Sequence, residues 1–457
     1  MEHTVHISQN LTWFFSGLLT CMICALALEE KLHAKKSIIV GFFAITSLIL
    51  ASWLGIIPFG DIILPSGHKL HMPVYIEAVD WEVIAIIIGS SLFVDVTSRS
   101  GLFSWVAIKL TKMSAGDPLK LLWYYGLMTV VFSAVLNNVT AMIIVGSLTG
   151  VSLNKLNRTD KLLGFLLIEG LLTNVGGLLT LISSVPNIIV GNTAGISFSE
   201  FFLKASPYVL VATVATLLLG ARIFNIKAIK KTDEKEEAAT LVKSFDENDS
   251  IQSRGFFIFS AVILVVFITM IATTSITPVI KDLGLGFVAM SFAIIALIRF
   301  KHDVDQFYKA IDWDLILFFI FLFVIINVME HAKVLELIGQ GVGLLIGNGE
   351  GKGGAVSLLA ASALFSSVTD NIPLSAMLAK ILSARNIASD SSLWWSVIFG
   401  ANLGGNITPI GSASTLVAVT IIHKYKIHLP FVSFIKKALP FALMQIILAV
   451  GYLLLFF

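Results

Sequence analysis

Charged residues are scarce in this sequence. Aspartate, glutamate, lysine and arginine together make up 13% of its 457 residues, whereas hydrophobic residues make up 56%. A soluble domain carries about a quarter of charged residues, so the composition predicts a polytopic membrane protein without a large soluble domain. The net charge of +2 is too balanced to favour a nucleic-acid partner.

Cysteines and enzyme motifs are also missing or rare. The two cysteines, Cys21 and Cys24, lie in the first apolar segment, where such residues usually pack as small hydrophobes. The sequence contains neither a Walker A phosphate loop nor a His-Glu-x-x-His zinc motif. We therefore expect no enzyme, no firm metal site and no cofactor beyond H+ or Na+ as a coupling ion.

Apolar segments of roughly membrane-spanning length recur along the chain. Lysine is concentrated at residues 29–36, which predicts a cytoplasmic loop there and an N-terminus outside. Residues 1–10 contain no lysine or arginine, so we expect the first segment to be retained in the bilayer of a prokaryotic plasma membrane. The predicted spans are residues 11–28, 38–57, 83–96, 203–221, 256–276, 283–298, 315–328 and 441–457.

Two further apolar stretches, residues 121–153 and 355–381, carry polar residues near their centres. Basic residues flank the first stretch on both sides, so both of its ends are expected in the cytoplasm. A chain that enters and leaves on one side either turns back within the membrane or crosses it twice in two unusually short spans, and we favour the first. The pattern therefore predicts two re-entrant hairpins, with tips near Asn137-Asn138 and Asp370-Asn371.

Two more apolar segments, residues 162–190 and 393–422, contain glycine pairs, a proline and small polar residues. About thirty helical residues would reach about 45 Å, well beyond a hydrocarbon core of roughly 30 Å. The interruptions therefore predict helices that break in mid-membrane, which is tolerated where the backbone is buried in protein or lines a cavity. Broken helices of this kind indicate a binding site for a small polar solute.

Four short motifs occur twice in the same order, at offsets of 228 to 233 residues; Asp80-Trp81, for example, matches Asp312-Trp313. The charge pattern places the start of the first copy outside and the start of the second inside. We therefore expect an all-α polytopic membrane protein with two inverted repeats, and a parallel duplication is the alternative. The predicted parts are N-terminal helices in 1–76, a first repeat in 77–221, a cytoplasmic linker in 222–254, linking helices in 255–308 and a second repeat in 309–457.

The hairpin tips and the broken helices hold the candidate substrate ligands, because amide and hydroxyl oxygens can replace the water around a solute or an ion. Sodium could bind at Asn137 and Asp370. The predicted substrate-binding residues are Asn137, Asn138, Thr140, Asn174, Gly176, Gly177, Thr180, Ser183, Ser184, Asn187, Asn371, Asn402, Gly404, Gly405, Asn406, Thr408, Gly411 and Ser412.

Two carboxylates are predicted to couple transport to ions. An ionisable group at membrane depth is expensive and indicates function, and Asp370 could bind H+ or Na+ there. Its counterpart in the first repeat is Asn137, so the predicted site is asymmetric in charge; the alternative is a structural cap on a half-helix. Glu169 lies about 12 Å along its helix and faces either the same cavity or only a helix interface.

The segments from Ser366 to Pro373 and from Asn406 to Thr415 resemble those of the ion-transporter superfamily. This group includes arsenite permeases, D-type sodium/proton antiporters, the P protein and the divalent-anion/sodium symporters. The resemblance covers nearly the whole chain and implies a scaffold, a moving transport domain with an elevator-like motion, and a homodimer. The tips differ from the Ser-Asn-Thr of the dicarboxylate symporters, which disfavours citrate or succinate as the substrate.

We therefore expect a secondary active transporter. The preferred function is proton-coupled antiport or efflux of a small inorganic solute, with arsenite or antimonite first; an arsenite pump could also bind a soluble ATPase. One alternative is Na+/H+ antiport through Asp370, and another is anion uptake at the half-helix N-termini near Gly176-Gly177 and Gly404-Gly405. A passive channel and a non-transporting receptor are the rival classes.

Overall fold

The computed structural model describes residues 7–57, 62–63, 69–70, 72–251, 253–300, 304–347 and 351–457. The first six residues, which include the N-terminus predicted to lie outside, and most of the loop over residues 58–71 are not among these residues. A short antiparallel pair of strands, β1 (Ile62–Ile63) and β2 (Lys69–Leu70), belongs to that loop. All the other regular elements of the described residues are helices.

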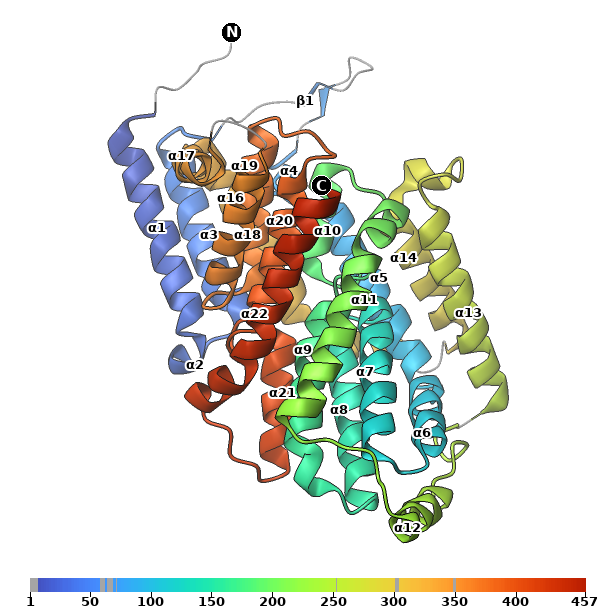
Figure 1. Cartoon of the computed structure of the whole chain (residues 1–457). Coiled ribbons are helices and arrows are strands. Elements are labelled where there is room, and N and C mark those ends of the chain that lie inside the picture. The colour runs from blue at the N-terminus through green and yellow to red at the C-terminus, as the bar shows by residue number, and fades with distance from the viewer. Residues whose placement is uncertain are drawn as a thin grey trace.

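The first half of the chain contributes long and short helices up to residue 223 (Figure 1). Its helices are α1 (Gln9–Ala27), α2 (Glu29–Leu32), α3 (Lys36–Trp53), α4 (Val74–Glu77), α5 (Trp81–Ser98), α6 (Leu102–Ser114), α7 (Pro118–Val135), α8 (Asn138–Lys155), the 3-10 turn η1 (Thr159–Lys161), α9 (Leu162–Gly176), α10 (Val185–Ala194) and α11 (Phe198–Ile223).

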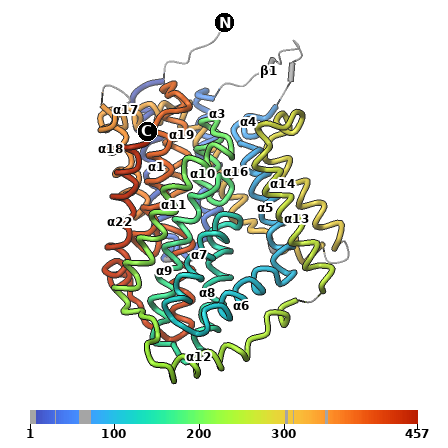
Figure 2. The backbone as a smooth tube through the Cα atoms, turned by 45° about the vertical axis from the view of Figure 1, so that its right-hand side comes forward, coloured from blue at the N-terminus to red at the C-terminus, as the bar shows by residue number. Residues whose placement is uncertain are grey.

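The second half follows α12 (Thr232–Lys243), which lies at the lower end of the molecule in Figures 1 and 2. Its helices are α13 (Arg254–Thr273), α14 (Ile280–Arg299), α15 (Val304–Ala310), α16 (Trp313–His331), α17 (Val334–Ile346), α18 (Lys352–Ser366), α19 (Asn371–Ala384), α20 (Ser392–Gly404), α21 (Ala413–Lys424) and α22 (Phe431–Phe456). Helices α1 and α3 of the first half lie beside α16 and α17, apart from α5–α11 (Figure 1).

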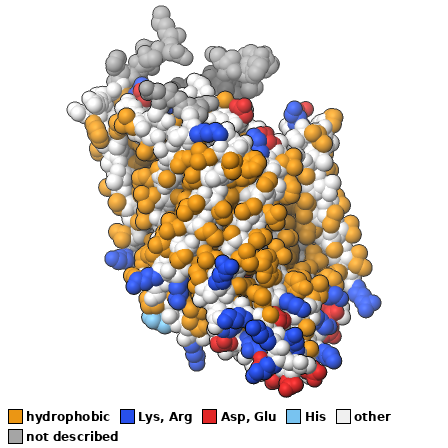
Figure 3. Space-filling model, viewed as in Figure 1, with side chains coloured by type: hydrophobic (Ala, Val, Ile, Leu, Met, Phe, Trp, Pro, Cys, Tyr) orange, Lys and Arg blue, Asp and Glu red, His pale blue; other side chains and the backbone are white. Residues whose placement is uncertain are grey.

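Within the described residues, nine helices are long and apolar enough to cross a membrane: α1, α3, α5, α7, α11, α13, α14, α16 and α22. The expectation of an all-helical polytopic membrane protein is thereby confirmed. One of the nine, α7, was expected as one arm of a hairpin, yet its 18 residues are long enough to span by themselves. Hydrophobic side chains cover the middle of the face seen in Figure 3, and charged side chains gather at its lower end.

Helices from the two halves pack against each other in a reciprocal way. Helix α5 lies along α14, and α16 lies along α3. At the start of α5, Glu82 accepts a hydrogen bond from the backbone N–H of Leu285 on α14 at 3.0 Å. At the start of α16, Asp314 accepts one from the hydroxyl of Ser37 on α3 at 2.5 Å. The corresponding helices α5 and α16 therefore each pack against a helix from the other half of the chain.

The linker between the halves is docked against the lower ends of α6, α7 and α8. The Lys112 ammonium donates to the Glu247 carboxylate, and Lys109 lies 3.7 Å from the same side chain. The N–H of Ile229 donates to Asp117 at 2.9 Å, and the Lys155 ammonium lies 4.6 Å from the centre of the Phe245 ring. These contacts tie the linker to both arms of the α7–α8 hairpin.

We expect Lys112→Ala to release this linker. The hydrogen bond from Lys112 is the main cause that lowers the pKa of the Glu247 carboxyl below its ordinary value. A lowered folded-state pKa stabilises docking above the ordinary pKa of about 4.3, and that contribution is lost as the pH falls through the folded-state value. Proteolysis by a glutamate-specific protease at α12 should therefore quicken in the variant at neutral pH, and in the parent protein on acidification.

Lys120→Ala is the matched control, because Lys120 is an exposed lysine near the start of α7, at the end of this helix where the linker docks. It should leave the proteolysis rate unchanged. Equal cleavage of the parent protein and the Lys112→Ala variant at neutral pH would show that this ion pair does not hold the linker.

Candidate functional site

Both predicted broken helices are interrupted in the structure. Helix α9 ends at Gly176 and α10 begins at Val185, whereas α20 ends at Gly404 and α21 begins at Ala413. Pro186 occupies the first turn of α10, where its missing N–H and fixed φ are tolerated. The non-helical segments 177–184 and 405–412 thus lie at corresponding places in the two halves.

The glycines that end α9 and α20 allow close backbone contact with the hairpins. A Cβ on Gly176 would lie 2.7 Å from the Cα of Val130 on α7, and one on Gly404 would lie 2.3 Å from the carbonyl oxygen of Ala363 on α18. A Cβ on Gly177 would meet the amide of Asn138 at 2.6 Å, and one on Gly411 would meet the carbonyl of Ser366 at 2.9 Å. The predicted glycines therefore pack against protein.

Side chains from the two non-helical segments cross over and bond to the other half. The hydroxyl of Ser184 donates to Asn402 at 2.8 Å, and the hydroxyl of Ser412 donates to Asn174 at 2.9 Å. These two bonds are equivalent under one offset of 228 residues, since 184 corresponds to 412 and 174 to 402. The structure thus brings these predicted residues together at the centre of the molecule.

The remaining amides extend this centre. Asn174 donates to Asn406 at 2.8 Å, Asn402 donates to Asn187 at 2.9 Å, and Asn187 donates to the carbonyl of Gly177 at 2.6 Å. All four asparagines are fully buried. Gly405 completes the packing, because a Cβ there would lie 2.9 Å from the carbonyl of Gly411.

Hydroxyl groups fasten the hairpins to the broken helices. In the first half, Thr180 donates to the carbonyl of Ala134 at 2.5 Å; in the second, Thr408 donates to the carbonyl of Ser367 at 2.5 Å. Ser183 donates to the carbonyl of Gly177 at 2.5 Å within its own segment.

The tip of the first hairpin is joined to the same network. Asn138 donates to Asn174 at 3.3 Å and accepts from Ser133 at 2.7 Å. Asn137 is exposed and caps α8 by accepting from the N–H of Thr140 at 2.8 Å. Among these, only Asn138 reaches the central amides through its side chain.

Gln445 on α22 belongs to the central network, although sequence reasoning did not select it. It is fully buried, accepts a hydrogen bond from Asn406 at 2.7 Å and donates to Thr216 of α11 at 3.0 Å. A lone glutamine within an otherwise apolar span was the signal that could have found it, because polar groups in mid-membrane are costly without partners.

The polar side chains of this network form their hydrogen bonds with other groups of the protein. The side chains of Asn138, Thr408 and Ser412 all have protein partners. A fully satisfied buried network fixes the relative positions of the elements that contribute to it. In this conformation its groups hold hairpins and broken helices together.

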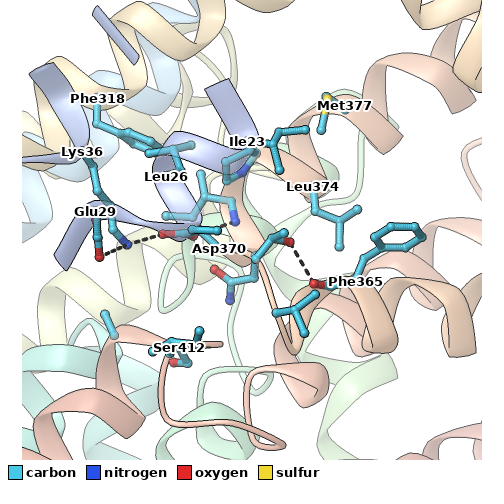
Figure 4. Close-up of a pocket in the computed structure, with 18 of the residues that line it drawn as sticks. Ile23, Leu26, Glu29, Lys36, Phe318, Phe365, Asp370, Leu374, Met377 and Ser412 are labelled. Carbon is cyan, nitrogen blue, oxygen red and sulfur yellow. Dashed lines mark hydrogen bonds and ion pairs between the residues drawn. The ribbon is translucent and has the colours of Figure 1, made fainter. Parts of the chain in front are cut away.

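A cavity of about 890 Å³ lies beside the second hairpin, between α18–α19 and the helices α1, α2, α3, α16 and α17. Its walls are largely apolar, with Ile23, Leu26, Phe318, Leu374 and Met377 among them (Figure 4). The predicted residues that line it are Asp370, Asn371 and Ser412.

An ion pair between Asp370 and Lys36 forms the charged centre of this cavity. The Lys36 ammonium lies 2.5 Å from the Asp370 carboxylate and 3.9 Å from that of Glu29 (Figure 4). The other oxygen of Asp370 accepts from the N–H of Ile372 at 3.0 Å and caps α19. The two side chains of the ion pair are 16% and 32% exposed for Asp370 and Lys36 respectively, so the pair is reachable but largely dry.

Lys36 is a residue that sequence reasoning used only for orientation. It is the first residue of α3, and the chain separates it from Asp370 by more than three hundred residues. Asp370 therefore serves both as a cap and as an ion-pair partner, and its role in ion coupling stays a prediction.

Glu169 lies away from this cavity. It is fully buried on α9, where it accepts a hydrogen bond from Thr149 of α8 at 2.6 Å. It does not line the cavity described above. Of the two positions expected for this side chain, the structure places it at a helix interface.

Comparison with known proteins adds evidence independent of this geometry. The profile of the CitMHS family, described as a citrate transporter, matches residues 23–400. A 46 kDa membrane protein of Mycobacterium leprae is 32% identical over 382 residues, covering 82% of this chain and 86% of that protein. The P protein of Mus musculus is 25% identical over 532 residues, covering 99% of this chain and 63% of that protein.

An uncharacterized transporter of Mycobacterium tuberculosis is 30% identical over 385 residues, covering 82% of this chain and 86% of that protein. Among solved structures, the YdaH transporter of Alcanivorax borkumensis matches with a TM-score of 0.61 at 12% identity, covering 92% of this chain and 98% of that one. MtrF of Neisseria gonorrhoeae matches with a TM-score of 0.54 at 13% identity, covering 93% and 95%. At such identities the structural matches show the fold alone.

Proposed function

Because the chain belongs to the CitMHS citrate-transporter family and is a secondary transporter, not an enzyme, we propose that it carries a small carboxylate-bearing anion together with a proton. The resemblance to the ion-transporter superfamily is confirmed by this membership. The observation that carries the proposal is the ion pair of Lys36 and Asp370 in a cavity beside the tip of a hairpin.

The ion pair supplies a way to couple the two ligands. A substrate carboxylate that binds the Lys36 ammonium displaces Asp370, which is then left as an unpaired carboxylate in a mostly apolar cavity. Leaving a charge without its partner at low dielectric is costly, so Asp370 takes up a proton. Release of the anion restores the ion pair and frees the proton on the other side.

The cavity suits an organic anion better than arsenite. Its volume of about 890 Å³ falls in the range of roughly 300–1,000 Å³ that small-molecule sites occupy. Neutral arsenite would need free hydroxyl and amide groups, yet Asn138, Thr408 and Ser412 are bonded to protein. None of the relatives described above supports arsenite, and the departure of the hairpin tips from Ser-Asn-Thr does not outweigh the family match.

We also propose that the chain consists of two inverted repeats that alternate access to this site. The reciprocal bonds of Ser184 and Ser412, and the exchanged partners of α5 and α16, support a twofold relation. Figure 2 shows α4 at the top and α6 at the bottom, so α5 runs downwards, whereas α16 ends beside α17 at the top. This antiparallel arrangement supports inversion of the second repeat.

The test is transport by purified protein in liposomes that contain a pH-reporting dye, with radiolabelled citrate outside. We expect citrate entry to be accompanied by internal acidification, and Asp370→Asn to abolish the acidification. Arsenite and Na+ are added separately as competing substrates. Proton movement driven by Na+ alone would overturn the proposal in favour of Na+/H+ antiport, and movement driven by arsenite alone would restore the efflux hypothesis.

A further inference from the structure

Glu169 is a buried carboxyl group that the proposed cycle does not use. It lies on α9, one to two turns before the break at Gly176, and its side chain is fully buried. Thr149 of α8 donates to Oε1 at 2.6 Å, whereas Oε2 is buried without a hydrogen-bond partner. One neutral hydroxyl is thus its sole hydrogen-bonding partner among the described residues.

No cation among the described residues pairs with this carboxyl. Helices α7, α8, α11, α20, α21 and α22 and the turn η1 pack against α9, and α7 brings the phenol of Tyr125 within electrostatic reach of Glu169. The other titratable residues of these elements lie in their first or last turns, or about one turn further in, except Tyr208, which is buried in the middle of α11. They are Lys120, Tyr124, Lys155, Asp160, Lys161, Glu200, Lys204, Tyr208, Arg222, His423, Lys424, Lys436, Lys437 and Tyr452.

The fold does not require a carboxyl here. The first residues of α9 and α20 are 230 positions apart in the sequence, and their last residues are 228 apart. The residue of α20 that corresponds to Glu169 is therefore Val397 or Phe399, and both are fully buried apolar side chains. Burying an isolated ionised carboxylate is far more costly than burying the neutral acid, since proteins usually neutralise such a group. The presence of a carboxyl group at this position therefore indicates that the group binds a proton.

We propose that Glu169 is a second proton-binding site, separate from Asp370, that holds its proton on Oε2 at the closed α8–α9 interface. The proton is exchanged when this interface opens to water during the transport cycle. No covalent bond changes other than O–H, which breaks on release and forms on uptake. This role rests on the proposed function, because it adds one proton to each transported anion.

A file of hydroxyl groups leads from Glu169 towards the lower end of the molecule. Thr149 and Ser152 lie three residues apart and share one face of α8. The hydroxyl of Tyr125 lies 2.8 Å from that of Ser152 and 2.7 Å from that of Thr111 on α6. Hydroxyls both donate and accept, so this file is a route by which a proton could reach Glu169 once water enters.

The first test needs no substrate. Infrared spectra of the purified protein in lipid at neutral pH should contain a carboxylic-acid C=O band that disappears in Glu169→Gln. Asp370→Asn is the matched control and should keep the band, because the Asp370 side chain forms an ion pair with Lys36 whereas Glu169 has no cationic partner among the described residues. Identical bands in the parent protein and Glu169→Gln would overturn the proposal, whatever the substrate proves to be.

The second test measures the number of protons per transported citrate. Glu169→Gln and Glu169→Met should both transport with one proton fewer, since neither side chain can exchange a proton. A purely structural hydrogen bond to Thr149 would separate the two variants, because Gln can keep this bond and Met cannot. An unchanged proton ratio in a transporting variant would overturn the second site, whereas absence of citrate transport in the parent protein would refute the proposed function alone.

Discussion

Asp370→Asn is expected to abolish proton-coupled transport. Asparagine keeps the size of the side chain and its oxygen can still cap α19 at Ile372, so the hairpin tip should keep its shape. It cannot take up a proton when the substrate displaces it from Lys36. Uptake of citrate driven by a pH gradient should therefore fall to the level of empty liposomes.

The same substitution should also lower stability, because it leaves Lys36 without its nearest partner. Removing one member of a buried pair costs about 3–5 kcal/mol, but exposed pairs are worth about 0–1 kcal/mol. This pair is intermediate in exposure and Glu29 remains 3.9 Å from Lys36, so we expect a loss of about 1–2 kcal/mol. Thermal unfolding in detergent measures it.

A double variant separates stability from coupling. Lys36→Met together with Asp370→Asn removes both charges and should recover most of the lost stability, since residues in direct contact do not contribute additively. Transport should stay absent, because neither the anion nor the proton then has its ligand. Coupled transport by the double variant would show that this ion pair plays no part in the mechanism.

Gly404→Ala should prevent the second hairpin from packing against its broken helix. An added Cβ would lie 2.3 Å from the carbonyl oxygen of Ala363 and 2.8 Å from its Cα, and backbone atoms cannot rotate away. Overpacking of a core costs about 1–3 kcal/mol and more where backbone must move, so we expect a lower melting temperature by several degrees and loss of transport. Gly176→Ala should have the corresponding effect on the first hairpin, where Val130 lies 2.7 Å away.

Gly451→Ala on α22 is the matched control for these variants. A Cβ there meets nothing within 4 Å, and alanine is favoured over glycine inside a helix by about 1 kcal/mol. This variant should unfold at the same temperature as the parent protein or a higher one. If Gly404→Ala behaved like Gly451→Ala, the close approach of α18 and α20 would not be needed for folding or transport.

The sequence indicated where the chain would be interrupted, because helix breaking is a local property. The glycine pairs at 176–177 and 404–405 and the prolines that follow them disfavour a continuous helix wherever they stand. The motif spacing likewise predicted equivalent segments in the two halves. It did not reveal that the glycines serve backbone contact, since that depends on which helix lies opposite.

The membrane class, the approximate positions of the membrane-length helices other than α7 and the transporter superfamily were thus determined by composition, by hydrophobic length and by motifs that can be read in order along the chain. The tertiary structure decided which side chains meet. Lys36 reaches Asp370, Asn406 binds Gln445, and Glu169 turns to α8 instead of the cavity. These contacts join segments between 20 and 334 residues apart, and they follow from how the helices pack, which no local pattern records.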